Sequence, residues 1–371
     1  MRNLKVFGSP GLYVQGPGAL LELGTLIAPI GKRALLVSDT MVVDMLAPRL
    51  TPVMAQAGIA FLAVSFTGDV TPANVARMSD EARAFAPDVV IAAGGGKGVD
   101  AGKAVGRELG ARQVSLPTAA SNDGPTSRNF VFYDEHHKLL SVEKLVRNPD
   151  LVLVDTDLIA QAPAALLVSG IGDALVKRFE AAQCIGADGP NMYGARATLA
   201  AEALAVRCDE VLRRHAVGAL AAARAKKPDA AFEQVIEACF LLAGLGFEGC
   251  GLSIAHAMTR GLSAVPQTAS ALHGCLVAYA LLVQFSLEGR DDAFMAEQIT
   301  FYRSVGLPTS LRDLGLTDPT AEELHTIADL THRAPHTRNF QRVLSVEDLL
   351  VAMRQVEDTA RHGMLSANEH G

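Results

Sequence analysis

Two histidines, His256 and His273, lie in an otherwise apolar segment rich in small residues, "GLSIAHAMTRGLSAVPQTASALHGCLVAYALL". Gly261 and Pro266 stand between them, so we do not expect one continuous helix across the segment. Two imidazoles in such surroundings are either hydrogen-bonded core residues or two ligands of one metal ion. A metal site requires at least one further ligand elsewhere in the chain.

Asp173 is the candidate for that third ligand. It follows Gly170 and Gly172 in "VSGIGDALVKRFEAAQ", and we place it in the first turn of a predicted helix. A carboxylate in that position is commonly a helix cap. One aspartate with two histidines also suits catalytic zinc or Fe²⁺ and leaves a position open for a substrate oxygen. The other histidines have polar or charged neighbours and are weaker candidates: His136, His137, His215, His325, His332, His336, His362 and His370.

A glycine-rich turn follows a buried apolar run in "DVVIAAGGGKGVDAGKAVG". The glycines at 94–96 allow backbone N–H groups to approach a phosphate, and the positive end of a helix predicted to begin near Val99 points to the same place. The pattern is neither G-x-G-x-x-G nor Walker A, because Gly98 follows Lys97. A plain tight turn is therefore the alternative to a pyrophosphate site.

Polar residues also follow two other predicted strands. Asp39 ends the first strand, where a carboxylate can bind an adenosine ribose and repel a 2′-phosphate, or cap a helix. The loop "PTAASNDGPTSRNFVFY" carries Thr118, Ser121 and Ser127, whose hydroxyls can bind cofactor or substrate, and Asp123, which can bind a substrate hydroxyl. Ordinary Asx or Ser/Thr turns are the alternative for each of them.

Strands and helices alternate in the first part of the chain. Short apolar runs predict five strands, at 33–39, 61–66, 88–96, 112–118 and 151–159. Helical patterns separate the first three strands, which predicts a doubly wound α/β domain over residues 1–162. Long Ala/Leu-rich segments replace the β-branched runs afterwards, so residues 163–371 are expected to form an all-helical domain.

Composition excludes several classes of function. The 371 residues are 49% hydrophobic and 20% charged, which is enough to bury a large core. The net charge of −7 and the lack of tryptophan argue against nucleic acid and anionic membranes as partners. The five cysteines include no CxxC pair, so neither a disulfide framework nor a four-cysteine zinc site is expected. No run of about 18 apolar residues occurs, and we expect a soluble cytoplasmic protein.

Taken together, these segments resemble the glycerol dehydrogenase family, within the iron-containing (type III) alcohol dehydrogenases. The resemblance runs through the whole chain. "SPGLYVQGPGALLELG" resembles the family's N-terminal hairpin, "GGGKGVDAGKA" its phosphate turn and "PTAASNDGPTS" its substrate and nicotinamide loop. "GIGDALVKRFEA" and "AHAMTRGLSAVPQTASALHG" are similar to the segments that carry its metal aspartate and its two metal histidines.

The resemblance implies a fold and a set of roles. The fold is a Rossmann-like NAD-binding α/β domain followed by an all-α domain, as in dehydroquinate synthase, with the site in the cleft between them. Asp173, His256 and His273 would bind the metal, Asp123 would contact substrate hydroxyls, and Asp39 would favour NAD over NADP. The remaining cofactor residues would lie along the pyrophosphate or near the nicotinamide: Gly95, Gly96 and Lys97, and Thr118, Ser121, Ser127, Asn129 and Tyr133.

The substrate region departs from the family pattern. The loop reads "SNDGP" rather than a sequence closer to "STDAP", and Asn122 and Gly124 resemble the related glycerol-1-phosphate dehydrogenases. Arg260 follows His256 by one helical turn, where an uncharged residue is usual. Arg128, Arg338 and the "HGC" at Cys275, in place of "HGE", are further differences. Arg260 is therefore predicted to read an anionic or polar group of the substrate, with an ordinary ion pair as the alternative.

The sequence thus predicts an NAD-dependent alcohol dehydrogenase that uses zinc, with Fe²⁺ as the alternative metal. It would oxidise a secondary alcohol in glycerol or a similar vicinal diol to the ketone, and catalyse the reverse reduction. The alternatives are a glycerol-1-phosphate dehydrogenase-like enzyme or a dehydrogenase of another anionic polyol, a lyase like dehydroquinate synthase, and a non-catalytic descendant. The resemblance also implies a homo-oligomer.

Overall fold

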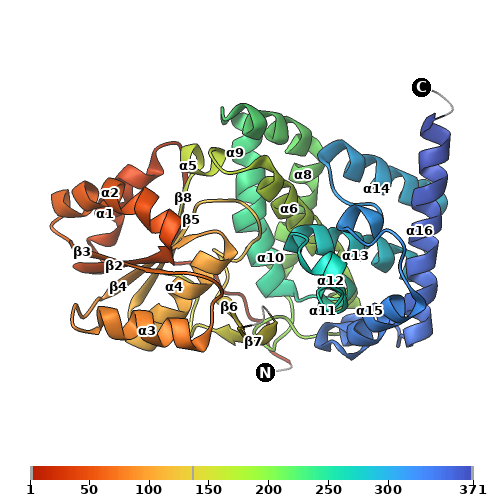
Figure 1. The fold of residues 1–371 in the computed structure, drawn as a ribbon, viewed down its shortest axis with the longest axis horizontal. Helices are drawn as coiled ribbons and strands as arrows, with labels where there is room; N and C mark the ends of the chain where they lie inside the picture. Colours follow the sequence, from red (N-terminus) through yellow and green to blue (C-terminus); the bar gives the residue numbers. More distant parts are fainter. Residues whose placement is uncertain (1–2, 136–137, 369–371) are drawn as a thin grey trace. The chain divides into compact units, whose positions relative to one another are not determined.

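A parallel sheet of six strands, in the order β1-β8-β5-β4-β2-β3, organises the first part of the chain in the computed structural model of the protein (Figure 1). These strands and a separate antiparallel pair, β6 and β7, are β1 Leu12–Gly16, β2 Arg33–Asp39, β3 Ala60–Phe66, β4 Val89–Gly94, β5 Arg112–Pro117, β6 Asn129–Tyr133, β7 Leu139–Lys144 and β8 Leu151–Asp155. The chain passes from β2 outward to β3 and then returns to β4 on the other side of β2. The strand order therefore reverses between β2 and β4, and ligands of such sheets bind beyond the strand ends at this reversal.

The structure describes residues 3–135 and 138–368, with side chains up to residue 361. His136, His137 and His370 lie outside this range, as does the side chain of His362. The chain forms two compact units. The sheet unit comprises Gly8–Ala164 and Ala222–Gly244, and the helical unit comprises the segment ending at Phe7, Ala165–Ala221 and the chain from Leu245 onward.

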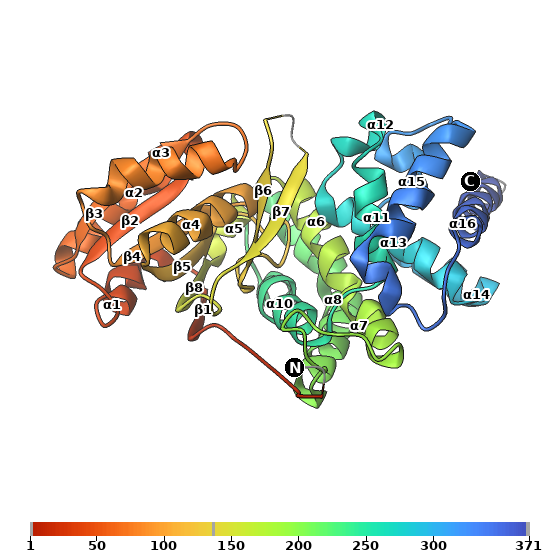
Figure 2. The ribbon, with the colours of Figure 1, turned by 90° about the horizontal axis from the view of Figure 1, so that it is seen from below.

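Helices cover both faces of the sheet. The helices of the sheet unit are η1 Ala19–Glu22, α1 Leu23–Ile27, α2 Thr40–Gln56, α3 Pro72–Arg83, α4 Gly96–Leu109, α5 Thr156–Ala160, α9 Ala230–Glu237 and the π-helical turn η2 Ala238–Leu242. Side chains of a strand alternate between its two faces. Leu36 accordingly packs in the core with α1 and α2, whereas Leu35 and Val37 pack with α3, α4 and β6. Figure 2 shows the β6–β7 pair beside α4.

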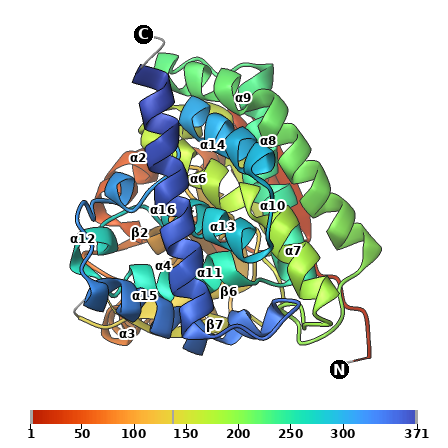
Figure 3. The same cartoon turned by 90° about the vertical axis from the view of Figure 1, so that its right-hand side faces the viewer.

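The helical unit holds no strand among the residues that the structure describes, apart from a single bridge between Lys5 and Arg196. Its helices are α6 Ala164–Leu175, α7 Lys177–Gly186, α8 Leu199–Ala225, α10 Ala243–Cys250, α11 Ile254–Leu262, α12 Pro266–Ala269, α13 His273–Leu287, α14 Asp292–Val305, η3 Arg312–Leu314, α15 Ala321–Arg333, η4 Pro335–Asn339 and α16 Val346–Asn368. Helix α11 contacts α13 and α15. Helix α16 runs across α13 and α15 (Figure 3).

The predicted fold class is confirmed, and several details of the prediction are wrong. The helix expected to begin near Val99 begins at Gly96. The strand expected at 151–159 ends at Asp155, because the Asp155 carboxylate accepts a hydrogen bond from Leu158 N (3.1 Å) and starts α5. The segment expected to be an N-terminal hairpin is not one. Leu12–Gly16 pairs in parallel with β8, and the chain then enters η1.

The sequence predicts two domains that divide the chain at 162/163, but two segments belong to the opposite unit from the one that this division gives them. The segment before Gly8 joins the helical unit, where Arg196 N donates to Leu4 O (2.8 Å). Residues 222–244 join the sheet unit, where the Gln15 amide donates to the Glu233 carboxylate (2.8 Å). Both connections depend on long-range pairs that local sequence patterns do not reveal.

One helical run within the described residues, Ala230–Cys250, is long and apolar enough by length and composition to cross a membrane. Most of it is buried inside the protein, as is usual for a core helix of a soluble fold.

We predict that Gly102→Ala destabilises the sheet unit. A Cβ atom at Gly102 would lie 2.4 Å from Ala92 Cα, so α4 could not keep its close approach to β4. The expected loss is about 1–3 kcal/mol of unfolding free energy, typical of overpacking, measured by urea denaturation. Gly110→Asn is the control, because Gly110 ends the same helix in open space with a φ of 66° that asparagine tolerates. Equal stability of the two variants would contradict this account of the α4 contact.

Candidate active site

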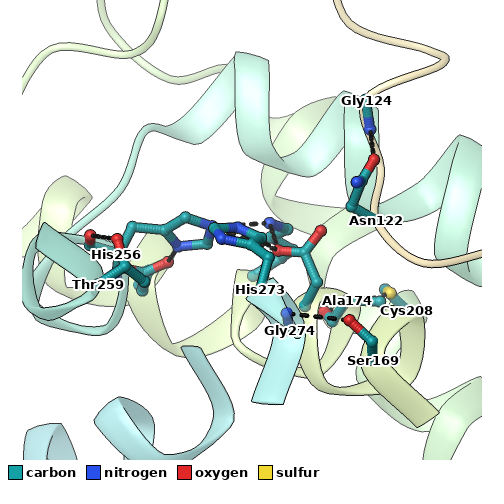
Figure 4. Close-up of polar contacts among 12 residues, drawn as sticks. Asn122, Gly124, Ser169, Ala174, Cys208, His256, Thr259, His273 and Gly274 are labelled. Atoms are coloured by element: carbon teal, nitrogen blue, oxygen red, sulfur yellow. Dashed lines mark hydrogen bonds and ion pairs between the residues drawn. The ribbon is translucent and has the colours of Figure 1, made fainter. Parts of the chain in front are cut away.

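Three side chains from three helices of the helical unit bring metal-binding atoms together. Asp173 comes from α6, His256 from α11 and His273 from α13, and their donor atoms lie within 4.8 Å of one another. Asp173 Oδ1 is 3.3 Å from His256 Nε2 and 3.9 Å from His273 Nε2. Figure 4 shows the rings of His256 and His273 beside each other. Two imidazole nitrogens and a carboxylate oxygen are the donor set of many catalytic zinc sites.

Close packing of α6 against the start of α13 positions Asp173 and His273. A Cβ atom at Gly172 would lie 2.4 Å from Gly274 O, so only glycine allows this approach. Ser169 Oγ accepts a hydrogen bond from Gly274 N (3.0 Å) and thereby caps α13 (Figure 4). Asp173 therefore lies in the last turn of α6, and its predicted place in a first turn is wrong, because the glycines before it serve helix packing.

The chain breaks between the two histidines, as predicted. Helix α11 ends at Leu262, and Pro266 starts the short α12 as its first residue. Gly261 does not cause this break. It lies inside α11, where a Cβ atom would be 2.3 Å from Ile327 O of α15. His256 is in the first turn of α11 and His273 is the first residue of α13.

Glu180 on α7 fixes the orientation of His256. Its Oε2 lies 2.5 Å from His256 Nδ1, so this ring nitrogen is the donor and Nε2 faces Asp173. Its Oε1 accepts hydrogen bonds from the backbone amides of Ser253 and His256 (2.9 Å each), which cap α11. A carboxylate behind a ligating histidine is a common device for holding the ring and raising its basicity.

Burial and charge oppose one another at this site. Burial disfavours the Asp173 carboxylate, but Lys177 and the two histidines outweigh it and hold the pKa of Asp173 well below its usual range. Burial also disfavours a charged His256, yet Glu180 raises the pKa of His256 to about 9. Asp173 is therefore an anionic donor at neutral pH, and a metal ion binding to Nε2 releases a proton from the ring.

The sequence interpretation missed Lys177 and Glu180. Lys177 Nζ lies 2.7 Å from Asp173 Oδ1, and its side chain is 1% exposed. The signal was present in "GIGDALVKRFEA", because positions four and seven residues after Asp173 lie on the same helical face. Residue type alone does not distinguish these two side chains from ordinary charged residues of a helix.

In the sheet unit, the glycine turn lies where the strand order reverses. Asp39 ends β2 and Gly94 ends β4, so both stand at the carboxyl edge of neighbouring strands. Asp39 caps α2 by accepting a hydrogen bond from Val42 N (3.1 Å). Helix capping is the role that the sequence offers as the alternative to ribose binding. Gly95 and Gly96 start α4, and the exposed Lys97 forms an ion pair with Asp69 (2.5 Å).

The hydroxyl-rich loop follows β5 and lies against the glycine turn. Thr118 N donates to Gly94 O (3.0 Å), and a Cβ atom at Gly96 would be 2.7 Å from the Asn122 amide. The buried Lys103 ammonium, missed from the sequence, donates to the carbonyl oxygens of Gly124, Ser127 and Asn129 (2.6, 2.7 and 2.9 Å). Lys103 thus stabilises the conformation of the loop through three of its carbonyl oxygens.

The other predicted residues of this loop have defined places. Asp123 and Ser127 are buried and Ser121 is half-buried, and Asn122 closes an Asx turn on Gly124 N (2.9 Å; Figure 4). Asn129 Oδ1 is buried and accepts no hydrogen bond from the residues that the structure describes. Burial raises the pKa of Tyr133 to about 12, so its hydroxyl remains protonated.

The basic candidates do not share one environment. Arg260 lies on α11 one turn after His256, with an exposed side chain. Arg338 is exposed on η4, and Arg128 is half-buried in the loop of the sheet unit. Cys275 and the other four cysteines, all among the described residues, form no disulfide.

Comparisons with known proteins find relatives over most of the chain. Residues 10–156 fit the family model of the iron-containing alcohol dehydrogenases. The chain is 40% identical to a glycolaldehyde reductase of Halobacterium salinarum, over 87% of this chain and 89% of the relative. It is 35% identical to a glycerol dehydrogenase of Thermotoga maritima, over 97% and 98% of the two chains. A solved probable glycerol dehydrogenase of Sinorhizobium meliloti superposes with a TM-score of 0.91 at 37% identity, covering 97% of this chain and all of that chain.

The chain belongs to the glycerol dehydrogenase family of iron-containing alcohol dehydrogenases. As a member of that family it is an oxidoreductase, with the activity of an alcohol or polyol dehydrogenase. The family resemblance inferred from the sequence is confirmed, and so is the predicted enzyme class.

We predict that Glu180→Gln weakens metal binding in this glycerol dehydrogenase relative. Glutamine keeps the size of the side chain but loses the charge that favours the protonated Nδ1 of His256. Loss of such a partner typically costs about ten- to a hundredfold in metal affinity, which equilibrium dialysis with zinc would measure. Glu297→Gln, an exposed change on α14, is the control. Unchanged zinc affinity in Glu180→Gln would show that Glu180 does not position His256 for a metal.

Proposed function

We propose that the protein catalyses the NAD- and metal-dependent oxidation of a secondary alcohol in glycerol or a similar vicinal diol, and the reverse reduction of the carbonyl. The observation that carries the proposal is the convergence of Asp173, His256 and His273, with Glu180 behind His256. Such a set is built for a metal that keeps an open position for substrate.

The residues fit a divalent metal. Asp173 and the two Nε2 atoms supply three donors, and Glu180 holds His256 with its Nε2 directed toward Asp173. Zinc is the metal that we propose, with Fe²⁺ as the alternative. When bound, the metal supplies a Lewis acid for the alcohol or carbonyl oxygen. His273, whose side chain is 47% exposed, leaves this donor set accessible from solvent.

The sheet unit fits a dinucleotide. The free amides at the start of α4, at Gly95, Gly96 and Lys97, suit the pyrophosphate. Asp39, at the end of β2, suits the ribose hydroxyls of NAD and would repel the 2′-phosphate of NADP. NAD, when bound, accepts the hydride.

We assign the nicotinamide half to the loop after β5 and to β6. Thr118, Ser121, Ser127 and Tyr133 offer hydroxyls there, and the buried Asn129 Oδ1 offers an acceptor for a donor from the cofactor. Lys103 keeps these groups in place through the loop carbonyls.

The proposed substrate carries oxygen atoms on adjacent carbons. A glycerol dehydrogenase and a glycolaldehyde reductase are both among the relatives, and both named compounds have this arrangement. We propose the buried Asp123 as the residue that accepts a hydrogen bond from a hydroxyl of this substrate.

The test is to follow NADH by absorbance with glycerol, propane-1,2-diol and glycolaldehyde, with and without a chelator. Asp173→Ala, His256→Ala and His273→Ala should each lose bound metal and about a thousandfold in activity, because the Lewis acid supplies several kcal/mol of transition-state stabilisation. His325→Ala, an exposed change on α15, should keep both. Retained metal in all three ligand variants would refute the assignment.

Arg260 lies one helical turn from His256, and its side chain is exposed. This position favours, as a second candidate, a substrate that carries an anionic group. In that case Arg260→Asn should raise the KM for glycerol 1-phosphate about ten- to a hundredfold, as for loss of hydrogen bonds to a charged group, and leave the KM for glycerol unchanged. Arg338→Asn is the control. If wild type and Arg260→Asn prefer neutral glycerol equally, the anionic substrate is excluded.

A further inference from the structure

A buried lysine lies among the atoms that would bind the metal. The Lys177 ammonium is 2.7 Å from Asp173 Oδ1 and 3.3 Å from His256 Nε2, and its side chain is 1% exposed. It also lies over the ring of Phe247, 5.4 Å from the ring centroid. A cation thus already occupies Asp173, one of the three proposed donors, and lies close to a second, His256 Nε2.

The position of this ammonium explains how two carboxylates are buried together. The side chains of Asp173 and Glu180 are 2% and 0% exposed, and burying such charges without a partner is costly. Lys177 follows Asp173 by four residues, so the chain delivers the compensating charge from the adjoining turn. The neighbouring Arg178 does not share the task, because it pairs with Asp209 (2.7 Å).

A metal ion and this ammonium cannot occupy the donors together. Zinc binds carboxylate oxygen and imidazole nitrogen at about 2.0–2.2 Å, which places it within the volume where Lys177 Nζ contacts the same atoms. Two cations at that separation in a buried site repel one another strongly. We expect the ammonium to leave Asp173 Oδ1 when the ion binds, and the face of the Phe247 ring is one contact that it can keep.

We infer that Lys177 is an internal competitor for the metal: its ammonium holds Asp173 in the metal-free protein, stabilises that state and weakens metal binding. This inference rests on the proposed metal centre. Apparent affinity falls in proportion to the fraction of molecules in which the donors are available, so a seated ammonium lowers zinc affinity without touching the ion.

The test compares zinc affinity by isothermal titration calorimetry in wild type, Lys177→Met and Arg178→Met. Methionine keeps the length of the side chain and removes the charge. Lys177→Met should bind zinc about tenfold or more tightly, in line with release of a competitor. Arg178→Met removes a neighbouring charge that points to Asp209, and should bind zinc as wild type does.

A second readout is the thermal unfolding of the metal-free proteins. Without metal, Lys177→Met should melt below wild type, and zinc should raise its melting temperature by more than it raises that of wild type. Lys177→Gln serves as a second variant, since it keeps a neutral donor for Asp173 if methionine prevents folding.

The outcomes separate this inference from the metal centre itself. If wild type binds zinc and neither lysine variant binds it more tightly, Lys177 is not a competitor and the inference is overturned, whereas the metal centre stands. If neither wild type nor any variant binds zinc, the metal centre fails and the inference falls with it.

Discussion

The buried carboxylate of Glu180 makes three contacts on which the proposed metal centre depends. One oxygen accepts hydrogen bonds from the Ser253 and His256 backbone amides and so determines where α11 begins. The other lies against His256 Nδ1 and determines which ring nitrogen faces Asp173. A single side chain on α7 thus fixes both the first residue of α11 and the orientation of the His256 ring. Without it, the start of α11 would lose its cap and the imidazole its orientation.

The close contact between α6 and α13 completes the arrangement. Gly172 and Gly274 let the two helices approach until Ser169 caps α13, which brings His273 beside Asp173. Gly172, directly before the aspartate in "GIGDALVKRFEA", is therefore a packing residue. Glycines also allow close packing in the sheet unit. Gly98 and Gly102 let α4 pack closely on β4, which places the first backbone amides of α4 where the strand order reverses.

Much of this could be predicted from the sequence, and the failures have definite causes. Strands such as β2 and β4 follow from short apolar runs, and the three metal-donor candidates follow from residue type and from the family resemblance. Asp173 was placed at the wrong end of its helix, because glycine is ambiguous between a helix boundary and a close contact. Glu180 and Lys177 were missed because their roles depend on partners brought together only by folding. The attachment of residues 222–244 to the sheet unit depends on pairs such as Gln15 with Glu233, which no local pattern contains.

The most direct measurement of the central claim is X-ray absorption spectroscopy at the zinc edge of the zinc-loaded protein. A centre built from Asp173, His256 and His273 predicts only nitrogen and oxygen neighbours at about 2.0–2.2 Å, with the scattering pattern of two imidazoles. A sulfur neighbour at about 2.3 Å would instead place the metal on a cysteine, such as the nearby Cys275, and would contradict the account. So would the scattering pattern of fewer than two imidazoles, because His256 and His273 could not then both be ligands.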